Sequence, residues 1–494
     1  MPPRERDEEA RPLLSAEGEQ NSYQNEEEPL QVSFSKDEDE NPKEWSRRKR
    51  LINVFIIAFM AILSPLASSM FTPGIQQIAK DLGSSEEAII ATTTGFVIFL
   101  GVGPLVLAPL SETFGRRIVY VASFAIFTLL QIPTALAPNA ATLIVVRTIS
   151  GFFGSVGIAN GGGTINDMYE PHERASIFGW YLLGPLLGPT LGPLFGGIIV
   201  NRLNWRWIYW ILTIVCAFNT TVGYFLLRET YAPVLLNKKR NLLEQQTGRK
   251  YTYEGADDRP IWTKLRQSMK RPIVIFIQPI VLVMSFYQAL IFGTTYSIFT
   301  NMQSIFSEMP YFFNSEQIGL LYLFPGAGFL FSVWFLVPRI DTVFNRLTEK
   351  NGGKSMPEYR LPLANIGGVL LPVSLFWFAW TVQYRMHWAV CMASTLFYGI
   401  GQVVIFNSIQ NYYIDSFSKY AASALAGGSV FRSIVGGVVP LFAPTVFDKL
   451  GYGWGISIFA FLAVAVAPSP ILFYYYGPRR AVPSSQKAPK ANGA

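Results

Sequence analysis

The stretch LGPLLGPTLGPLFGG, residues 183–197, lies inside a long apolar run that contains no charged side chain. Gly-Pro recurs in it every four residues, at Gly184-Pro185, Gly188-Pro189 and Gly192-Pro193. In water a proline inside a helix costs about 3 kcal/mol, because it removes a hydrogen bond and its ring clashes with the preceding turn. In a membrane, neighbouring helices can satisfy the freed backbone groups, and glycine allows two helices to approach closely. The stretch therefore indicates a bent membrane-spanning helix with a smooth glycine face.

Hydrophobic residues make up 50% of the 494-residue chain and charged residues 15%, whereas a soluble domain usually carries about 25% charge. A membrane-spanning helix needs about 20 apolar residues. Runs of this length occur at roughly 51–72, 88–110, 117–137, 141–163, 175–200, 205–227, 272–297, 316–337, 361–382, 388–411, 421–446 and 452–476. The longest hydrophilic insert separates six runs from six. We therefore expect an all-α membrane protein whose twelve transmembrane helices form two pseudo-symmetric six-helix bundles.

The predicted organisation has five parts. They are a disordered acidic cytoplasmic tail (1–48), an N-terminal six-helix bundle (49–228), a cytoplasmic central loop (229–271), a C-terminal six-helix bundle (272–477) and a cytoplasmic tail (478–494). The first tail is rich in Glu and Asp and poor in aromatic residues, which is typical of disorder. Basic residues concentrate in alternate loops, and the positive-inside rule then places both termini in the cytoplasm.

The few cysteines and histidines argue against several classes of protein. Cys216 and Cys391 both lie in apolar runs, and His172 and His387 are the two histidines of the chain. A disulfide framework or a metal centre is therefore not expected. We also find no Ser/His/Asp set and no phosphate-binding loop, so we expect neither an enzyme nor a bound cofactor. The basic residues lie in short loops between apolar runs, which does not indicate nucleic-acid binding.

A weak internal repeat relates the two halves. The segment APLSETFGRR (108–117) follows the second run, and VPRIDTVFNR (337–346) follows the eighth. Four pairs align at a constant offset, namely Pro109/Pro338, Glu112/Asp341, Thr113/Thr342 and Arg117/Arg346. Two six-helix halves with matching loops are the layout of a parallel-repeat transporter, whose substrate site lies between the halves near the midplane.

Further motifs occur in order along the chain. They are NPKEWS (41–46), PLSETFGRR (109–117), RTISGFFG (147–154), GPLLGPTLGP (184–193), RETYAPVLL (228–236), NGGKSMPEYRLP (351–362) and AASALAGGSVFRSIVGG (421–437). Over almost the whole chain after the first tail, the sequence resembles the major facilitator superfamily, and within it the fungal members of the twelve-span drug:proton antiporter family. Ala108 and Glu112 stand where the loop motif usually has Gly and Asp, and Pro193 stands where the antiporter motif usually has Gly. The resemblance implies the major facilitator fold and secondary active transport.

The loop motif supplies candidate gate residues, namely Glu112, Gly115, Arg116 and Arg117. A carboxylate and a guanidinium there can form a charge-assisted pair, and the carboxylate can also face the N-terminus of a neighbouring helix. The resemblance implies that such a contact latches the halves on the cytoplasmic side, with helix eleven as the partner. For the two arginines, plain positive-inside topology is the alternative.

Arg147 lies within the fourth run, where a charge costs several kcal/mol unless it is paired or hydrated. The resemblance implies a role in proton coupling, and an anchor to backbone carbonyls is the alternative. No Asp or Glu lies at the centre of a run, although a carboxylate with a raised pKa is the expected proton carrier in a membrane. Coupling is therefore expected at Asp167 or Asp415, or through the charge of the substrate, and a uniporter-like mechanism stays open.

Polar residues inside apolar runs are candidates for a substrate pocket. They are Asn219, Tyr287, Gln288, Gln402, Asn407 and Arg432. Interhelical hydrogen bonds are the alternative for each of them, and packing or backbone anchoring is the alternative for Arg432. In the fifth run, the four-residue spacing keeps Gly184, Gly188 and Gly192 on nearly one face. We expect this face to pack against the eighth run at the interface between the halves, and the resemblance ties it to antiport.

The sequence predicts a proton-coupled exporter of an amphipathic small molecule, such as a drug, toxin or secondary metabolite. The proton gradient would supply the energy without a cofactor, and the protein would be a monomer in the plasma membrane whose partners are lipids, protons and the substrate. A polyamine, organic-anion or nutrient carrier is the alternative, and the two arginines inside the membrane favour an anion. A membrane sensor that binds without transporting is a third possibility, although a sensor needs no repeat.

Overall fold

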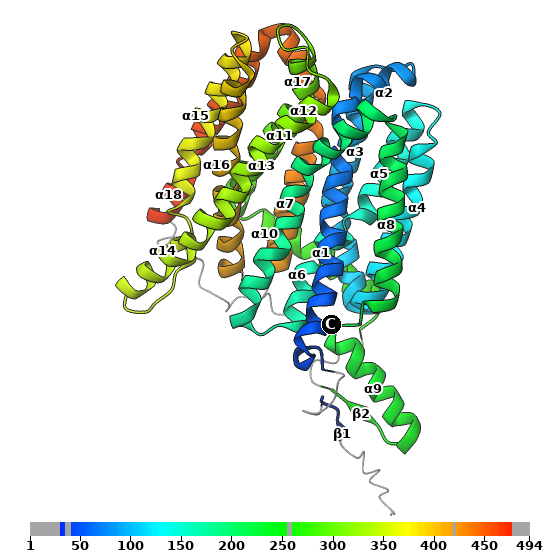
Figure 1. The fold of residues 1–494 in the computed structure, drawn as a ribbon. Helices are drawn as coiled ribbons and strands as arrows, with labels where there is room; N and C mark the ends of the chain where they lie inside the picture. The colour runs from blue at the N-terminus through cyan, green and yellow to red at the C-terminus, as the bar shows by residue number, and fades with distance from the viewer. Residues whose placement is uncertain (1–29, 35–40, 254–258, 418–420, 477–494) are drawn as a thin grey trace, which may run out of the picture.

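The computed structural model describes residues 30–34, 41–253, 259–417 and 421–476, and these are mostly helical (Figure 1). The first half forms α1 (Arg47–Ser69), α2 (Ile75–Asp81), α3 (Glu86–Phe114), α4 (Arg116–Ala135), α5 (Ala140–Gly154), α6 (Val156–Met168), α7 (Pro171–Arg202) and α8 (Arg206–Leu226). The second half forms α11 (Pro279–Ser307), α12 (Ser315–Leu321), α13 (Leu323–Phe331), α14 (Val337–Lys350), α15 (Ala364–Gln383), α16 (Trp388–Ser416), α17 (Ala421–Val466) and α18 (Ser469–Tyr476). Short helical turns add η1 (Pro42–Glu44), η2 (Thr72–Gly74), the π-helix η3 (Ser332–Leu336) and η4 (Pro357–Arg360).

Eleven segments of the described chain are long and apolar enough to cross a membrane. The last of them, Ala424–Tyr475, has 52 residues, whereas one crossing needs about 20. Gly451 interrupts its helix with a φ of 74° and a ψ of 164°, so the chain changes direction there. The expected runs 421–446 and 452–476 lie on either side of this glycine. The helices therefore confirm the predicted all-α membrane fold and are consistent with twelve crossings.

Each half of the chain has its own buried core. One cluster of buried side chains runs from Trp45 to Leu227 and includes the fully buried Trp205. A second cluster runs from Ile275 to Ala463. The chain thus folds into two helical bundles that lie side by side (Figure 1).

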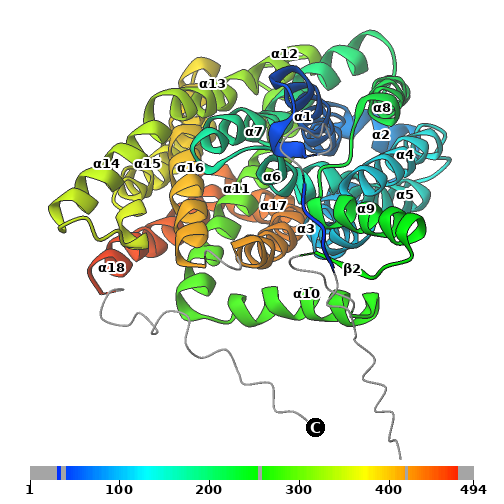
Figure 2. The same ribbon diagram turned by 90° about the horizontal axis from the view of Figure 1, so that it is seen from below.

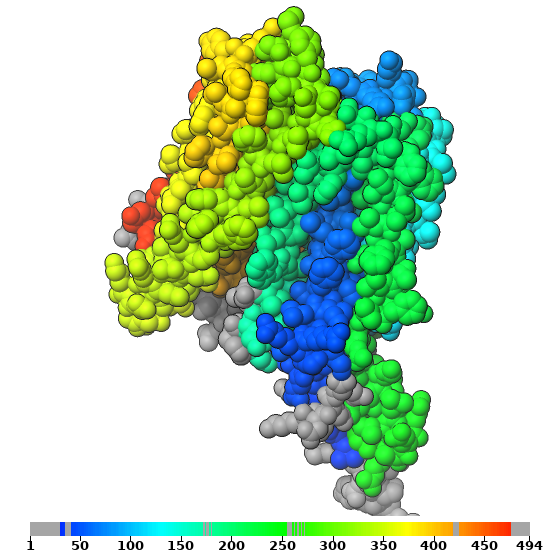
Figure 3. All heavy atoms as spheres, viewed as in Figure 1, coloured from blue at the N-terminus to red at the C-terminus, as the bar shows by residue number. Residues whose placement is uncertain are grey.

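Two sets of helices join the bundles. The helix α3 of the first bundle packs against α17 of the second, and α7 packs against α12 and α13. At the first contact the hydroxyl of Thr94 donates to the carbonyl oxygen of Gly437 at 2.8 Å. Figure 3 shows α7 between α1 and the helices of the second bundle. We call the line along which the bundles meet the seam.

The segment between the bundles contains α9 (Ala232–Thr247) and α10 (Ile261–Phe276). Seen from below, α10 crosses the bundle end, where it contacts both α3 and α17 (Figure 2). The expected start of the seventh run, residue 272, falls inside α10, and the next helix, α11, begins at Pro279. We call this end of the molecule the α9 end, and the opposite end, at the top of Figure 1, the α2 end.

Part of the segment expected to be a disordered tail has a defined structure. The strand β1 (Leu30–Gln31) pairs in parallel with β2 (Tyr251–Thr252), and the amide of Val32 donates to the carbonyl oxygen of Thr252 at 2.7 Å. Trp45 is buried against the first bundle. These contacts depend on a partner strand some 220 residues away, which composition alone does not reveal. Residues 1–29 and 35–40 of the expected first tail and all of the expected tail 478–494 lie outside the described residues.

Candidate functional site

A charge cluster at the α9 end of the first bundle is centred on Arg116. This arginine is 6% exposed, and its Nε lies 3.2 Å from Oδ2 of Asp167. Its Nη2 lies 3.8 Å from Oε1 of Glu112, and its Nη1 donates to the hydroxyl of Ser111 at 2.6 Å. A guanidinium carries five donors in a fixed fork, so one buried arginine can join the ends of α3, α4 and α6.

Glu229, which follows α8, caps the N-terminus of α4. Its Oε1 accepts from the amide of Arg116 at 2.8 Å, and its Oε2 accepts from the amide of Arg117 at 3.0 Å. The positive end of the helix dipole favours a carboxylate at this position. Gly115 has a φ of 102°, and a Cβ there would overlap Oε2 of Glu229. The motif glycine is therefore required both by the backbone and by the close approach of Glu229.

The other two predicted gate residues have partners inside the first bundle. The Nη2 of Arg117 donates to the carbonyl oxygen of Tyr224 at 2.8 Å. The half-exposed Glu112 forms its ion pair with Arg116. Between described residues, no ion pair joins Glu112 to α17. The latch to helix eleven stays a prediction, because the side chains at the start of α17 lie outside the described residues.

The second bundle has a corresponding cluster centred on Arg360. The guanidinium of Arg360 forms an ion pair with Asp341 and lies 2.7 Å from Oδ2 of Asp415. In the sequence repeat, Asp341 aligns with Glu112, whereas the arginine comes from a different place. The helix α14 continues through the exposed Arg346 to Lys350, and the chain then returns to supply Arg360 from η4. The sequence repeat therefore pointed to the carboxylate Asp341 of this cluster but not to its arginine, Arg360.

Arg147 lies in α5 and is 1% exposed. Its Nη2 donates to the carbonyl oxygens of Ala67 at 3.1 Å and Ser68 at 3.4 Å. These carbonyls belong to the last turn of α1, where backbone acceptors lack helical partners and the dipole favours a cation. The rings of Phe71 and Tyr209 lie 4.6 Å and 5.6 Å from its Cζ. Arg147 is therefore a C-terminal cap of α1 as well as a buried charge.

Arg432 lies in α17 and is only partly buried. Its Cζ lies 5.1 Å from the ring centroid of Phe292 in α11 and 5.2 Å from that of Phe406 in α16. Its Nη2 lies 3.2 Å from the hydroxyl of Ser429, one turn earlier on the same helix, and its Nε is buried without a partner. No described carboxylate forms an ion pair with it.

Apart from Gln288, whose Oε1 lies 3.9 Å from the position of a Cβ on Gly428, one turn before Arg432, the remaining pocket candidates are not brought together. Asn219 is buried in α8, which packs against α4 and α1 of its own bundle. Gln402 accepts from the hydroxyl of Thr295 at 3.2 Å, and the side chain of Asn407 donates to a carbonyl of its own helix. Tyr287 is fully buried toward α15. Gln402 forms a hydrogen bond between helices and Asn407 forms one within its own helix. Both contacts match the structural alternative and not a role in a substrate pocket.

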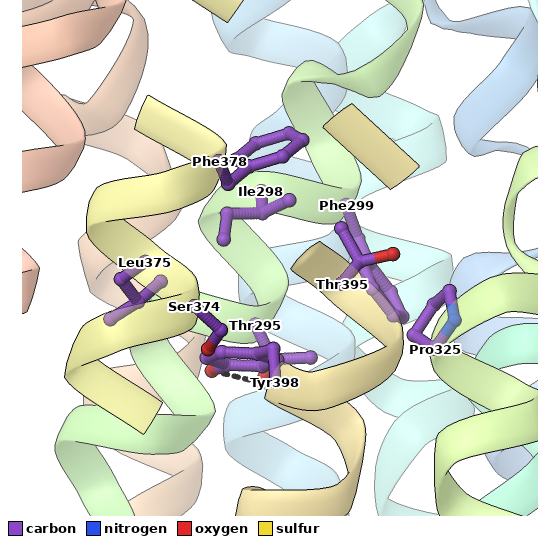
Figure 4. A pocket seen from close by; sticks show the side chains of 9 residues that line it. All are labelled: Thr295, Ile298, Phe299, Pro325, Ser374, Leu375, Phe378, Thr395 and Tyr398. Carbon is purple, nitrogen blue, oxygen red and sulfur yellow. Dashed lines mark hydrogen bonds between the residues drawn. The ribbon is translucent and has the colours of Figure 1, made fainter. Parts of the chain in front are cut away.

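A small cavity lies inside the second bundle among α11, α13, α15 and α16 (Figure 4). The hydroxyls of Thr295 and Tyr398 are 2.9 Å apart at its edge, and Ser374 and Thr395 add further hydroxyls. Its free volume is about 10 Å³, which is the space that about one water molecule needs. It is lined by residues of the second bundle and is too small for an organic substrate.

The glycine face of α7 packs against α1, not against the eighth run. A Cβ on Gly188 would lie 3.0 Å from the amide nitrogen of Leu66, and one on Gly192 would lie 2.7 Å from the carbonyl oxygen of Leu66. Gly184 faces the same helix near Ala58. The expected partner was wrong because repeat symmetry predicts which helices are equivalent but not which side of a helix meets which neighbour. The helix α7 does contact α12 at the seam, through another face that includes Gly197.

The two bundles are tied together at the α2 end. The guanidinium of Arg202, at the end of α7, contacts both carboxylate oxygens of Glu316 in α12, at 3.2 Å and 2.7 Å. Asn201 donates to the same carboxylate at 3.2 Å. The hydroxyl of Ser315 donates to the carbonyl oxygen of Pro73 at 3.0 Å. Deeper in the seam, the hydroxyls of Ser68 and Tyr296 are 3.3 Å apart.

Residues 57–440 match the sequence model of the Major Facilitator Superfamily. The chain belongs to this superfamily. It is similar to the MFS-type transporter penM of Penicillium rubens, at 37% identity over 446 residues that cover 90% of this chain and 87% of the relative. The efflux pump radE of Floropilus chiversii is also 37% identical, over 447 residues that cover 90% of this chain and 83% of the pump. A solved D-xylose-proton symporter shares the fold, with a TM-score of 0.63 and 14% identity over 88% of this chain and 98% of its own.

The predicted fold and the resemblance to fungal members of the superfamily are thereby confirmed, and the chain is a multi-pass membrane transporter. Within this superfamily member, sequence reasoning missed three contacts, namely the Glu229 cap, the Arg360 centre and the Arg202–Glu316 pair. One signal could have found the first of them. The helix α4 begins with Gly115-Arg116 and so has no capping side chain of its own, which means that another segment must supply the acceptor.

Proposed function

We propose that this transporter is a proton-driven exporter of amphipathic small molecules, such as a drug, toxin or secondary metabolite, and that it works by alternating access. One observation carries the proposal, which is the one-sided closure of the seam. Among the ion pairs between described residues, Arg202–Glu316 at the α2 end joins the bundles. At the α9 end Glu112 pairs within its own bundle. At that end α10 of the connecting segment contacts both α3 and α17, and the proposal is that the halves separate there.

Export rather than uptake is supported by the similarity to radE, which is named an efflux pump. The Gly-Pro stretch supports antiport, because the resemblance ties this element to antiporters. In the proposed cycle, deprotonated Asp167 pairs with Arg116, and protonation of Asp167 removes this ion pair. Arg147 supplies fixed positive charge at the end of α1, close to the Ser68–Tyr296 contact between the bundles.

The proton gradient is the proposed energy source, so the cycle requires no cofactor. The proposed setting is the plasma membrane, with a monomer whose two termini face the cytoplasm. The basic residues near α1 and α4 support this orientation through the positive-inside rule. Labelling of tags at the two termini in intact and permeabilised cells tests the orientation, and labelling of either tag in intact cells would contradict it.

The function is tested by measuring efflux of rhodamine 6G and of a panel of neutral and anionic dyes from cells with and without the protein. We expect efflux of at least one class of dye that stops when a protonophore collapses the gradient. Efflux that ignores the protonophore would contradict proton coupling, and no efflux of any dye would contradict export. Asp167→Asn is expected to keep downhill flux but to lose transport against a gradient. Asp448→Asn, at an exposed site, is the matched control.

A further inference from the structure

We infer that Arg432 binds the anionic group of the transported molecule, and that the substrate is an organic anion with an aromatic body. The inference rests on the proposed transport function, because it assigns a substrate class to the seam between the bundles. It begins from a difference between the two arginines that lie inside the helical bundles.

Arg147 donates to backbone carbonyls of the protein, whereas no described carbonyl or carboxylate accepts from Arg432, and the Nε of each arginine is buried without a partner. The guanidinium of Arg147 is enclosed, donates to two backbone carbonyls and lies against three aromatic rings. Arg432 is partly exposed, and the one described oxygen within hydrogen-bond distance is the neutral hydroxyl of Ser429. A guanidinium keeps its charge in any protein environment, so a charge at this depth needs an anion or water.

The position of Arg432 places this unsatisfied charge beside the seam. The next residue, Ser433, fills the space opposite Gly101 in α3 of the other bundle. The ring of Tyr296 lies 5.0 Å from Phe292, which stacks under Arg432, and the hydroxyl of Tyr296 contacts Ser68 of the other bundle. A parallel-repeat transporter binds its substrate at this kind of location, between the halves and near the midplane.

Hydrogen-bond donors without acceptors gather around Arg432. Its own Nε and the Nε2 of Gln288 are both buried without a partner. Gln288 lies one turn before Phe292 on α11, and its Oε1 is 3.9 Å from the position of a Cβ on Gly428, one turn before Arg432 on α17. The two donors therefore lie about one helical turn apart on facing helices. Buried donors of this kind are costly until an acceptor is supplied.

The chemistry of the missing acceptor follows from these neighbours. A carboxylate can accept two parallel hydrogen bonds from a guanidinium, and such charge-assisted pairs are stronger than neutral ones. The rings of Phe292 and Phe406 lie against the guanidinium and make its surroundings apolar and aromatic. An aromatic carboxylate supplies both the charge and the apolar surface, whereas a neutral or cationic compound leaves Arg432 uncompensated.

The test uses the purified full-length protein in lipid nanodiscs, without a proton gradient. Equilibrium dialysis measures the binding of 1-naphthoate, 9-anthracenecarboxylate and 4-biphenylcarboxylate, and of the primary amide of each acid. The amides keep the shape of the acids but carry no charge. We expect at least one acid to bind about 10-fold or more tightly than its amide, because a hydrogen bond to a charged group is worth more than a neutral one. Empty nanodiscs correct for partition into lipid.

Substitution then assigns the preference to one residue. Arg432→Gln is expected to weaken binding of that acid by about 10- to 100-fold and to leave the amide unchanged. Arg432→Lys should retain part of the preference, and Arg346→Gln, at an exposed arginine of α14, should retain all of it. If no acid binds more tightly than its amide, or if Arg432→Gln weakens both equally, the inference is wrong. If Arg432→Gln does not fold, the inference is still tested by comparing each acid with its amide in the wild type and in Arg432→Lys.

Because this measurement needs neither a gradient nor flux, it is separable from the proposed function. Selective binding of the acid without protonophore-sensitive efflux would contradict proton coupling and leave the role of Arg432 standing. Proton-driven efflux without any preference for the acid would support the proposed function and contradict the role of Arg432.

Discussion

Replacing Gly319 by alanine should open the α2 end without unfolding either bundle. Gly319 lies in α12 and faces α7 of the other bundle. A Cβ at this position would lie 2.6 Å from the carbonyl oxygen of Pro193 and 3.3 Å from Cα of Leu194, whereas ordinary contact begins at 3.4 Å. The nearest atom is backbone and cannot rotate away. The two helices must therefore separate by about 0.8 Å, the difference between 3.4 Å and 2.6 Å.

The cost of this separation falls on one conformation of the transporter. Overpacking a tight contact costs about 1–3 kcal/mol. Within α12 itself, alanine favours the helix by about 1 kcal/mol relative to glycine. The contact joins two bundles rather than two parts of one core, so the bundles keep their folds while the closed state is penalised. A penalty of 1–3 kcal/mol lowers the ratio of closed to open molecules by about 5- to 150-fold.

The assay measures the distance between spin labels on the two bundles at the α2 end by pulsed electron paramagnetic resonance. Labels at Lys80→Cys and Met309→Cys report this distance, in a background in which both native cysteines are replaced by serine. We expect the short-distance population of the wild type to shift to longer distances in Gly319→Ala. Size-exclusion chromatography of the same sample monitors folding.

A matched control comes from the same contact. A Cβ on Gly326 in α13 would lie 3.2 Å from the hydroxyl of Thr190 in α7, which needs a shift of only a few tenths of an ångström, far less than at Gly319. Gly326→Ala should therefore leave the distances unchanged. A Gly319→Ala protein with the wild-type distribution, or two variants with the same shift, would refute the reasoning. The Arg202–Glu316 pair at the same end should contribute less, because solvent screens it.

Three further substitutions test the charge clusters at the α9 end. Glu229→Gln should lower the stability of the first bundle by about 0.5–2 kcal/mol through loss of the α4 cap, seen as a lower unfolding temperature, whereas Glu349→Gln, at an exposed site, should not. Gly115→Ala should lower the unfolding temperature more than Glu229→Gln, because the new Cβ displaces the carboxylate of Glu229 and alanine is also strained at a φ of 102°. An equal or smaller effect would contradict the close contact. Arg360→Gln should destabilise the protein by about 1–3 kcal/mol by leaving two carboxylates unpaired, and a silent variant would contradict a stabilising role for the Arg360 cluster.

The membrane helices were predictable because hydropathy reports burial in lipid directly. The amphipathic α10 was not, since its first turns carry charged residues and its apolar end, Ile273–Phe276, merges in the sequence with the seventh run. The break at Gly451 was placed correctly by the short polar interval between the last two runs. Periodicity and hydropathy thus define segments and their faces, and amphipathic helices at bundle ends escape this signal.

The charge clusters were only half predictable, for a different physical reason. The loop motif predicted that Glu112, Gly115 and Arg116 belong to one cluster. Glu229 and Asp167 complete that cluster from segments 50 or more residues away, and nothing local marks which distant carboxylate will reach the start of α4. Such pairs are fixed by the packing of the helices, so they become visible only when the fold is known.

The Gly-Pro stretch of α7 has two smooth faces with different tasks. Gly192 and Gly197 are five residues apart, which is about 140° around the helix, so one faces α1 and the other faces α12. At Gly192 the backbone of α7 closely approaches the hydroxyl of Ser69 and the carbonyl oxygen of Leu66 in α1, so the two helices pack as one tight unit of the first bundle. At the seam, Gly197 and Gly319 bring α7 and α12 into similar backbone contact. Because no interdigitated side chains have to be pulled apart there, the bundles can separate along this face while α7 stays fixed to α1. A glycine-rich helix at this position therefore has a close contact on each side, and the proposed alternating access requires that the contact with α12 opens while the contact with α1 stays closed.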